Sequence, residues 1–541
     1  MRRGRLHVEG GSMTSVLKMS LAALMVAASL ASGAPASAQT SPNELDALFA
    51  RAATSRPLLR ILLTKLPKGA DLHNHAGGGT YAEDFVAWAA EADGCFSKST
   101  QSLEPGPCAG NTDLTPLRGL PERDPDLYSD ILDALSTRRF EQGVGDPEIS
   151  GHRRFFRTFG RSGRVGGADR GVRIQAEALR QAALDNTLYL ELMAGSNASR
   201  PVIEASAAMP WVDPWIKTAD GSPPDRLDAK ILRERLDRLA PVIAKATAAS
   251  TVLADANDKA IAALNRCGTA KPEPACAVTL RYLLSISRQR PPEVVFGQMA
   301  AAFALVKADP RYVGINILEP EDGPVSLRDY RLHMRLFAFF KTLYPDVPLT
   351  LHAGELAMGL TPPRDMRFHM TEAVEVAGAR RIGHGVSIAY EDDADKLLAR
   401  MARDKIAVEI NLTSNDVILG VKGKDHPLPL YLAAGVPVTL STDDLGVSRS
   451  DLTNEYMRAV VEQGVRYGQL KQMSRDSLTY SFLQGASLWD GACAAVKGPT
   501  PSTPCAAVLK ASPKARDQWR LERAFDAYEI EMKAIVGKLA P

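Results

Sequence analysis

Residues of the kinds that bind metal ions and move protons occur in four short stretches far apart in the chain. They are His73-Asn74-His75, His352-Ala353-Gly354-Glu355, Gly383-His384-Gly385 and Thr442-Asp443-Asp444. Imidazole nitrogens and carboxylate oxygens favour Zn²⁺, and three histidines with one aspartate leave a coordination position for water. A spare acidic group beside such an ion can act as a proton donor. The four stretches therefore indicate metal-dependent hydrolysis, provided that the fold brings them together.

Taken alone, each stretch also has a simpler explanation, such as surface polarity for His73 and His75 or a helix N-cap for Asp443 and Asp444. A strand, however, directs His73 and His75 to the same side, because side chains alternate along it. The glycines beside His384 are interpreted as giving its imidazole open space toward solvent or substrate.

The spacing of the four stretches can be explained if each one ends a β-strand. Short apolar segments alternate with longer helix-like segments along the chain, which is typical of parallel strands joined by helices. The predicted strands are Ala70–His75, Thr187–Met193, Val278–Ile286, Tyr312–Leu318, Pro348–His352, Arg381–His384, Ile406–Leu412 and Val436–Thr442. Eight such units close a (β/α)₈ barrel, whose active site lies at the carboxyl ends of the strands. The predicted fold class is therefore α/β, a (β/α)₈ barrel with loop insertions and additional N- and C-terminal helices.

The remaining segments predict the domain organisation. Residues 1–38 are typical of a secretory signal peptide, with Met13 as an alternative start, and residues 39–64 of a helical arm for homodimer contacts. The barrel is expected to span residues 65–541, with Gly-, Pro- and Ser-rich insertions near 91–125, 196–224 and 491–514. We expect an exported protein, periplasmic or secreted, with no membrane span after signal cleavage.

Export would make disulfide bonds chemically permissible. Six cysteines fall into three sequence-local pairs, Cys95 with Cys108, Cys267 with Cys276, and Cys493 with Cys505. Local pairing is the simplest of the connectivities that six cysteines allow, and free buried thiols are the alternative.

The charge balance argues against a nucleic-acid partner. Lys and Arg number 65 against 63 Asp and Glu, so the formal net charge of +2 creates no long-range field that would select nucleic acids or anionic membranes. The sequence also lacks the H-x-E and P-C-x-x-C signature of zinc deaminases that act on flipped bases. We therefore expect a small-molecule ligand.

Four motifs in this order resemble those of the adenosine deaminase family within the amidohydrolase superfamily. They are the run from Pro67 to His75, His352-Ala353-Gly354-Glu355, Ile382-Gly383-His384-Gly385 and Ser441-Thr442-Asp443-Asp444. The signal pattern, the paired cysteines and Glu321-Asp322-Gly323 are closer to the secreted, growth-factor-related branch of that family. The resemblance implies hydrolytic deamination of adenosine, or a related 6-aminopurine nucleoside, to inosine and ammonia with one Zn²⁺ per chain.

The resemblance also implies a role for each matched residue. The zinc ligands would be His73, His75, His352 and Asp443. Glu355 would protonate purine N1, His384 would orient the attacking water, and Asp444 would hydrogen-bond N7. These roles agree with the chemistry, since a proton donor must lie within hydrogen-bond reach of the ring that it protonates.

Two positions depart from the family pattern. Gly77 stands where the family has an Asp that contacts the ribose 5′-hydroxyl, and Glu319 stands where the family usually has a Gly. These changes could shift the preference to another nucleoside, a nucleotide, a free base or a modified adenine. Substrate contacts are also predicted for Glu319, Glu191 and Phe156, although aromatic residues at helical spacing are more often core. Three residues that end the seventh predicted strand could contact substrate or cap the next helix: Asn411, Ser414 and Asn415.

Two other functions stay open. One is hydrolysis of another small amide, ester or phosphoester by a related barrel. Many such enzymes use two metal ions bridged by a carboxylated lysine on the fourth strand, and Tyr312–Leu318 contains no lysine. The other is a secreted, non-catalytic binding protein with a structural zinc. Four protein ligands close a structural site, whereas Glu355, His384 and Asp444 would be spare here.

Overall fold

The computed structural model describes residues 44–138, 140, 150–162, 167, 169–218, 224–493 and 500–539. The predicted signal peptide (1–38) lies outside the described residues, as do residues 39–43 of the predicted arm and parts of the insertions at 196–224 and 491–514.

Eight parallel strands form the centre of the fold. They are β1 (Ala70–His75), β5 (Tyr189–Ala194), β6 (Thr279–Ser287), β7 (Tyr312–Leu318), β8 (Thr350–Ala353), β9 (Arg381–His384), β10 (Ala407–Ile410) and β11 (Val438–Leu440). Hydrogen bonds order them in two sheets, β1-β5-β6-β7 and β11-β10-β9-β8. Parallel bridges from Ile315 to Leu349 and from Asn74 to Asp443 join the two sheets at both edges. The strands therefore close into a barrel, which confirms the predicted (β/α)₈ fold.

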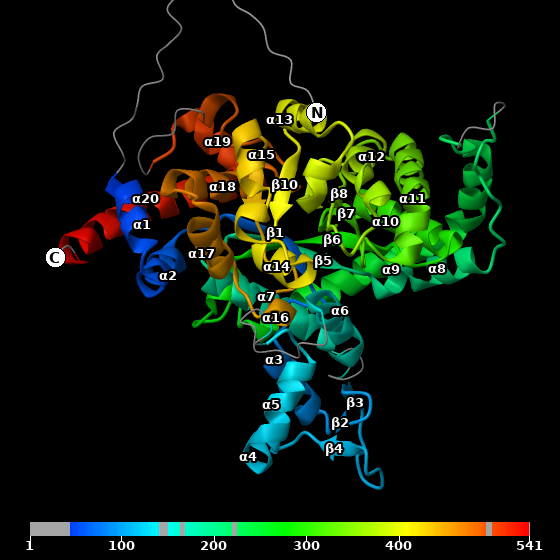
Figure 1. Ribbon diagram of the computed structural model, residues 1–541, viewed down its shortest axis with the longest axis horizontal. Coiled ribbons are helices and arrows are strands. Elements are labelled where there is room, and N and C mark those ends of the chain that lie inside the picture. The colour runs from blue at the N-terminus through cyan, green and yellow to red at the C-terminus, as the bar shows by residue number, and fades with distance from the viewer. Residues whose placement is uncertain are drawn as a thin grey trace, which may run out of the picture. The chain divides into compact units, whose positions relative to one another are not determined.

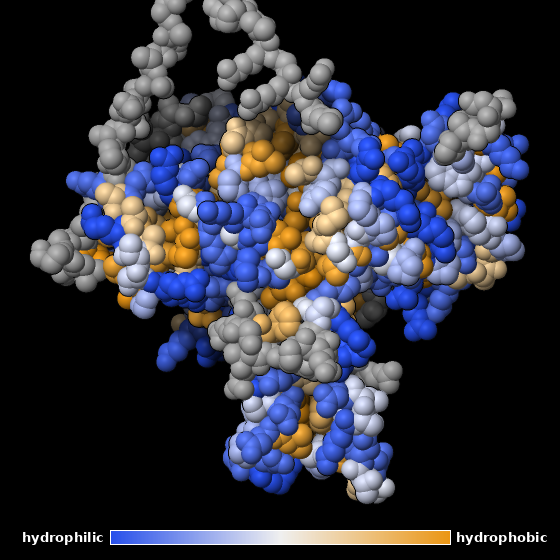
Figure 2. Space-filling model, in the orientation of Figure 1, coloured by the Kyte–Doolittle hydropathy of each residue, from blue (hydrophilic) through white to orange (hydrophobic). Residues whose placement is uncertain are grey.

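Helices connect and cover these strands (Figure 1). They are α1 (Glu44–Ala52), α2 (Arg56–Lys65), α3 (Ala82–Glu91), α4 (Leu120–Arg123), α5 (Pro125–Ala134), α6 (Gly151–Ser162), α7 (Arg170–Leu184), α8 (Arg200–Ala207), α9 (Ala229–Leu264), α10 (Pro292–Ala308), α11 (Pro324–Leu343), α12 (His369–Glu375), α13 (Ala394–Asp404), α14 (Leu412–Leu419), α15 (Leu428–Ala434), α16 (Leu445–Ser448), α17 (Leu452–Gln463), α18 (Tyr467–Thr479), α19 (Thr503–Ala511) and α20 (Pro513–Leu539). On the face drawn in Figure 2, hydrophilic residues cover much of the outer helices and hydrophobic residues show mainly between them.

Each predicted strand overlaps an observed one, and the differences lie at the strand ends. The predicted strand Ile406–Leu412 is shorter in the structure, because β10 stops at Ile410 and helix α14 begins at Leu412. The strands are short because their carboxyl ends turn at once into the loops that carry the polar residues.

The interior of the barrel contains a buried ion-pair network that the sequence did not reveal. Arg381 of β9 donates to Glu191 of β5 at 2.6 Å and to Glu409 of β10 at 2.5 Å. Glu191 also accepts hydrogen bonds from the Tyr189 hydroxyl and the Phe482 backbone N–H. Its side chain is fully buried below the cavity described in the next subsection, so the predicted contact between Glu191 and substrate is wrong.

The insertion near 91–125 is not a simple loop. It contains a three-stranded antiparallel sheet in the order β3-β2-β4, formed by Cys95–Ser97 (β2), Ser102–Glu104 (β3) and Leu114–Pro116 (β4). Phe96 and Leu103 pack against residues of α3 and α5, so the insertion has its own small core. The structure also confirms the three local disulfides, which join Cys95 to Cys108, Cys267 to Cys276, and Cys493 to Cys505.

The apolar sides of the additional helices are used within the chain. Phe49 of α1 lies against Tyr467 of α18 with ring centroids 5.1 Å apart, and Tyr467 also stacks with Tyr528 of α20. The homodimer contacts expected of the N-terminal arm stay a prediction. Among the described helices, α9 is the one long and apolar enough to cross a membrane, yet it packs along α7, α8 and α10.

Replacing Arg381 by Met should destabilise the barrel strongly. Two buried carboxylates, on Glu191 and Glu409, would lose their shared cation, and breaking a buried pair in this way costs about 3–5 kcal/mol. We expect the free energy of unfolding in urea to fall by that amount.

A matched control is Arg400→Met, because Arg400 pairs with Glu375 where both side chains are well exposed. Such surface pairs contribute about 0–1 kcal/mol. Equal losses of stability in the two variants would contradict the importance of the interior network.

Candidate metal centre and active site

Closure of the barrel places the first and last strands side by side and builds the candidate metal centre. The Asp443 N–H donates to the carbonyl of His73 at 2.8 Å, and the His75 N–H donates to the carbonyl of Asp443 at 3.1 Å. Backbone hydrogen bonds that continue the sheet thus fix Asp443 beside His73 and His75, which lie about 370 positions earlier in the sequence.

The side chains of these residues converge with His352 on one point. The Nε2 atom of His73 lies 3.1 Å from Nε2 of His352 and 3.4 Å from Nε2 of His75. The Asp443 Oδ1 atom lies 3.1 Å from Nε2 of His75 and 3.6 Å from Nε2 of His73. Ligands about 2.0–2.1 Å from a tetrahedral Zn²⁺ would lie about 3.3–3.4 Å apart. The four predicted ligands therefore fit one ion of this size.

Hydrogen bonds on the far sides of the rings direct the Nε2 atoms of His73 and His352 toward this point. Nδ1 of His73 donates to Glu409 at 2.8 Å, and Nδ1 of His352 donates to the side-chain oxygen of Asn316 at 2.9 Å. Such outer contacts fix the orientation and tautomer of metal-binding histidines. Burial lowers the pKa of His73. The hydrogen bonds and charges of Asp443 and Glu409 outweigh this effect and raise the pKa to about 10. A metal ion would therefore have to displace a proton from His73.

His384 lies next to this point, but its hydrogen bonds give it another role. The His426 Nδ1 atom accepts from the Leu428 N–H at 3.1 Å, so its Nε2 carries the proton and donates to Asn415 Oδ1 at 3.0 Å. The Asn415 amide then donates to Nδ1 of His384 at 2.9 Å. Burial lowers the pKa of His426 to about 4 and that of His384 to about 3, so both rings are neutral.

This chain of hydrogen bonds leaves the proton of His384 on Nε2, which lies 3.9 Å from Asp443 Oδ2. A protonated nitrogen cannot bind a metal ion, so His384 is suited to contact water beside the ion rather than the ion itself. The interpretation that flanking glycines give His384 open space is wrong, because its ring is fully buried. Gly383 instead makes room for His73, since an added Cβ would lie 2.7 Å from that ring.

Glu355 is held over the same point by another buried carboxylate. Glu321 accepts hydrogen bonds from the backbone N–H groups of Gly354 at 3.1 Å and Glu355 at 2.8 Å, and from Nδ1 of His369 at 2.6 Å. Burial raises the pKa of Glu355 well above its usual range, and the charges of Asp443 and Glu321 raise it further. This shift favours the protonated form of Glu355, which is the form that a proton donor needs.

Asp444 is a second carboxyl group whose environment favours the protonated form. Burial, followed by the charge of neighbouring Asp443, raises the pKa of Asp444 well above its usual value. For Asp443 itself, burial would raise the pKa, but hydrogen bonds from His73 and His75 hold it well below the usual range. Gly78 lets the backbone approach Asp444, because a Cβ there would lie 1.9 Å from Oδ1. That oxygen has no hydrogen-bond partner among the described residues.

Three residues of the site adopt left-handed backbone conformations that residues other than glycine rarely adopt. They are Glu319 (φ 78°), His384 (φ 68°) and Asp443 (φ 59°), each at or just after the end of a barrel strand. This conformation costs roughly 1–2 kcal/mol per residue. Such strain gathers at functional sites, where the surrounding structure holds it in place. Glu319 thus keeps a glycine-like backbone at the position where it departs from the family pattern.

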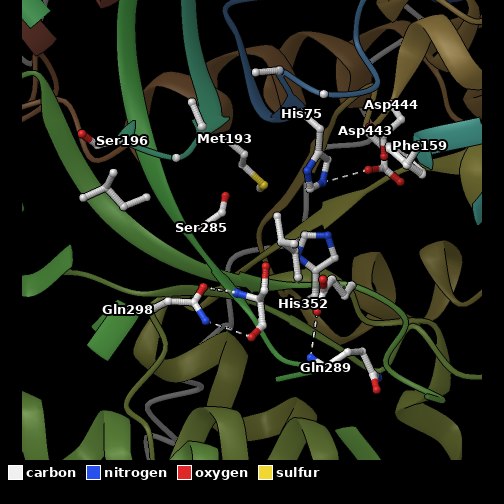
Figure 3. Close-up of a pocket in the computed structure, with 18 of the residues that line it drawn as sticks. His75, Phe159, Met193, Ser196, Ser285, Gln289, Gln298, His352, Asp443 and Asp444 are labelled. Carbon is white, nitrogen blue, oxygen red and sulfur yellow. Dashed lines mark hydrogen bonds and ion pairs between the residues drawn. The ribbon is translucent and has the colours of Figure 1, made fainter. Parts of the chain in front are cut away.

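A cavity of about 850 Å³ opens above these residues. Figure 3 shows His75, His352, Asp443 and Asp444 on its wall, with Phe159 beside the two aspartates. Glu355, Glu319 and Phe156 line it as well, so these predicted residues are in a position to contact a ligand. Phe155 lines the cavity and also belongs to a small core with Val417 and Val447.

No local sequence pattern distinguishes the residues that support the site. Glu409 and Asn316 are single polar residues inside apolar strands, and Glu321 belongs to a short acidic motif. Ser414 and Asn415 were expected to contact substrate or cap a helix. In the structure Ser414 donates to Asp443 Oδ2 at 2.5 Å, and Asn415 holds His384.

The adenosine deaminase family model matches residues 247–487. This segment belongs to the adenosine deaminase family. It contains His352, Glu355, His384 and both aspartates, whereas His73 and His75 lie before it. The fold supplies the two remaining histidines to the adenosine deaminase segment, through the contacts of β1 with Asp443.

Curated relatives match over about a quarter of the chain. The adenosine deaminase of Shewanella denitrificans is 37% identical over 136 residues, which are 25% of this chain and 38% of the relative. The adenosine deaminase of Aliivibrio fischeri is 38% identical over 139 residues, which are 26% of this chain and 38% of the relative. The matched region thus spans about two fifths of the length of these relatives. A solved N6-mAMP deaminase from Arabidopsis is 19% identical, with a TM-score of 0.46 over 78% of this chain and 95% of its own.

Replacing Asn415 by Leu should release His384 from its fixed tautomer. The variant leaves the His426 Nε2–H and the His384 Nδ1 without their partner, and unsatisfied buried polar groups cost about 1–3 kcal/mol. We expect the free energy of unfolding to fall by that amount. Imidazole ¹⁵N shifts of histidine-labelled protein should change for His384 and His426, while the content of bound metal stays the same.

Asn111→Leu is the matched control, because Asn111 is exposed in the small insertion. An exposed substitution of this kind changes stability by about 0.5 kcal/mol or less. An unchanged ¹⁵N pattern in Asn415→Leu would show that Asn415 does not determine the protonation of His384.

Proposed function

We propose that this protein is a metal-dependent hydrolase that deaminates adenosine, or a closely related 6-aminopurine nucleoside, to inosine and ammonia. One observation carries the proposal. The Nε2 atoms of three histidines converge with the carboxylate of Asp443. Beside them Glu355 and Asp444, whose pKa values burial raises well above the usual range, line one cavity together with His75, His352 and Asp443. In the reaction water adds to C6, the bond from C6 to the amino nitrogen breaks, and ammonia leaves.

The residues proposed to hold the ion are His73, His75, His352 and Asp443, a set of nitrogen and oxygen donors that favours Zn²⁺. When bound there, such an ion supplies the Lewis acidity that makes water a nucleophile at neutral pH. His384 presents its Nε2–H to the same place and accepts no metal, so it orients the attacking water and stabilises developing negative charge. Asn415 and His426 are positioning residues for this step.

Glu355 supplies the proton that makes the purine reactive. Its raised pKa keeps it protonated, and it donates to N1 as water adds to C6, which removes electron density from the carbon under attack. Glu321 is the positioning residue, since its two oxygens hold the backbone of Gly354 and Glu355.

Asp444 recognises the other side of the ring. A protonated carboxyl can donate to N7, an acceptor, whereas an ionised carboxylate would repel it. Asp444 and Glu355 therefore donate hydrogen bonds to two ring nitrogens, N7 and N1, which flank C6. This pair of donors favours a 6-aminopurine over the amide, ester or phosphoester substrates of related barrels, which offer no such pair of acceptors.

The site also separates this function from that of a non-catalytic zinc protein. A structural zinc is enclosed by its ligands and needs no adjacent acid. Here Glu355 and Asp444 both line a cavity large enough for a small molecule. We also propose export of the protein, supported by its three disulfides, since such bonds persist mainly in oxidising compartments.

Glu355→Gln should nearly abolish deamination without removing the metal. Glutamine cannot give up a proton, and loss of a general acid typically lowers kcat by about 10²–10⁴-fold. The measurement is the absorbance change and ammonia release with adenosine, together with the metal content of the purified protein.

Glu375→Gln serves as the matched control, because Glu375 is an exposed residue of α12 whose carboxylate pairs with Arg400. It should retain the activity of the unmodified protein. Loss of metal from Glu355→Gln would mean that Glu355 is a ligand rather than the acid.

Asp444→Asn and Asp444→Ala should differ in a defined order. Asparagine keeps an N–H donor for N7, so we expect kcat/KM to fall by about tenfold, whereas alanine removes the donor and should cost about 10²-fold or more. Steady-state kinetics with adenosine at saturating zinc would measure both. Equal losses in the two variants would mean that Asp444 acts as a charged group and not as a donor.

A further inference from the structure

The cavity extends beyond the barrel. At about 850 Å³ it lies near the upper end of the range for small-molecule pockets, about 300–1,000 Å³. Leu284 and Ser285 are successive residues of β6, so their side chains point to opposite faces of the sheet. Both line the cavity. The cavity therefore passes around the end of β6, from the barrel interior to the layer of α8 and α10.

We call this outer part the side compartment. Its walls are Ile203 of α8, Leu284 of β6, and Gln298 and Ala302 of α10. In Figure 3 Gln298 and Ser196 lie on the opposite side of the cavity from Asp443, Asp444 and Phe159. The side compartment is thus the end of the cavity that is remote from the candidate metal centre.

Polar side chains near the side compartment are already satisfied. Gln298 accepts from the Ser287 N–H at 2.9 Å and donates to the Ser287 carbonyl at 3.3 Å. Gln175 accepts from the Tyr282 hydroxyl at 3.0 Å. The Ser285 hydroxyl is buried without a partner among the described residues, but it points to the other face of β6. A strongly polar occupant would lose its hydrogen bonds to water without replacement, so the compartment favours an apolar group.

The described lining of the cavity offers no cationic side chain to an anion. Among the described residues that line it, none is Lys or Arg, whereas four are carboxylic acids: Glu319, Glu355, Asp443 and Asp444. The nearby Arg290 pairs with Glu319 at 3.4 Å, so its charge is balanced. A phosphate group in the side compartment would therefore meet no cationic side chain to compensate for its lost hydration.

The orientation of the purine decides which part of the substrate reaches the side compartment. With C6 at the metal centre and both ring nitrogens held by Glu355 and Asp444, the sugar points away from the metal. Gly77 adds no side chain to the cavity wall, and a Cβ built there would meet nothing within 4 Å. No side chain at position 77 therefore narrows the cavity beside the sugar.

We propose that the preferred substrate is an uncharged 6-aminopurine nucleoside whose sugar carries an apolar substituent, and that this substituent fills the side compartment. This inference rests on the proposed function, because it assumes that C6 of the purine reacts at the metal centre. It adds a basis for substrate selection, since a nucleoside with a phosphate in the same place is rejected.

The test compares three substrates with the zinc-loaded, full-length protein: adenosine, 5′-deoxy-5′-methylthioadenosine and AMP. An added apolar group in a matching pocket raises kcat/KM by about tenfold or more, which is the gain expected for the methylthio compound over adenosine. AMP should be about 10²-fold poorer than adenosine, since its phosphate would lose hydration without gaining a cationic partner.

Two variants test whether the side compartment is responsible. Ile203→Phe fills it and should lower the ratio of kcat/KM for the methylthio compound to that for adenosine, by about tenfold. Val252→Phe is the control, because Val252 is 68% exposed on α9 and does not line the cavity, so it should leave the ratio unchanged. Circular dichroism and metal content establish that both variants are folded.

The outcomes separate the two proposals. Deamination of adenosine with equal or lower activity on the methylthio compound, or with equal activity on AMP, overturns the inference and leaves the proposed function in place. An unchanged ratio in Ile203→Phe also overturns it. Failure of all three substrates with zinc bound overturns the proposed function, and with it this inference.

Discussion

The candidate site depends on the closure of the barrel, in which the last strand is paired with the first. Hydrogen bonds between the backbone of Asp443 and those of His73 and His75 fix the distance between the carboxylate and the two imidazoles. The metal centre is therefore a product of sheet formation and needs no flexible loop to assemble. This explains why Asp443 occupies a left-handed backbone conformation, because its carboxylate must turn inward where the strand ends.

Buried charge around this centre serves three different purposes, which the local environment of each group decides. Glu409 stays ionised because Arg381 and His73 stabilise it, and it orients a ligand. Burial and nearby negative charge raise the pKa of Glu355 and so favour its protonated form, which a proton donor needs. Arg381 joins the strands below the centre and has no contact with the cavity. One barrel thus contains a proton donor (Glu355), a residue that orients a metal ligand (Glu409) and a structural ion pair (Arg381). The different surroundings of these groups keep their functions separate.

The same fold separates reaction from substrate selection. The groups proposed to act on C6 end strands β1, β8, β9 and β11, whereas the side compartment is formed by β6 with α8 and α10. Helix α8 belongs to an insertion between strands, so its residues can change without disturbing the metal centre. Loops and insertions at the carboxyl ends of barrel strands allow this general separation.

The sequence by itself determined the fold class and the approximate positions of the eight strands, and it predicted the local disulfide pairs and the polar residues proposed to act in the cavity. It could do so because strand periodicity, cysteine spacing and chemically special residues are local properties. Only the tertiary structure decided which of those residues meet. It removed Glu191 from the cavity, because Arg381 on another strand holds it in the interior. It also gave the flanking glycines of His384 a different purpose, and it revealed the positioning roles of Glu321 and Asn415. These contacts join segments up to hundreds of residues apart, and no local pattern encodes them, since they depend on how strands and loops pack after the barrel has closed.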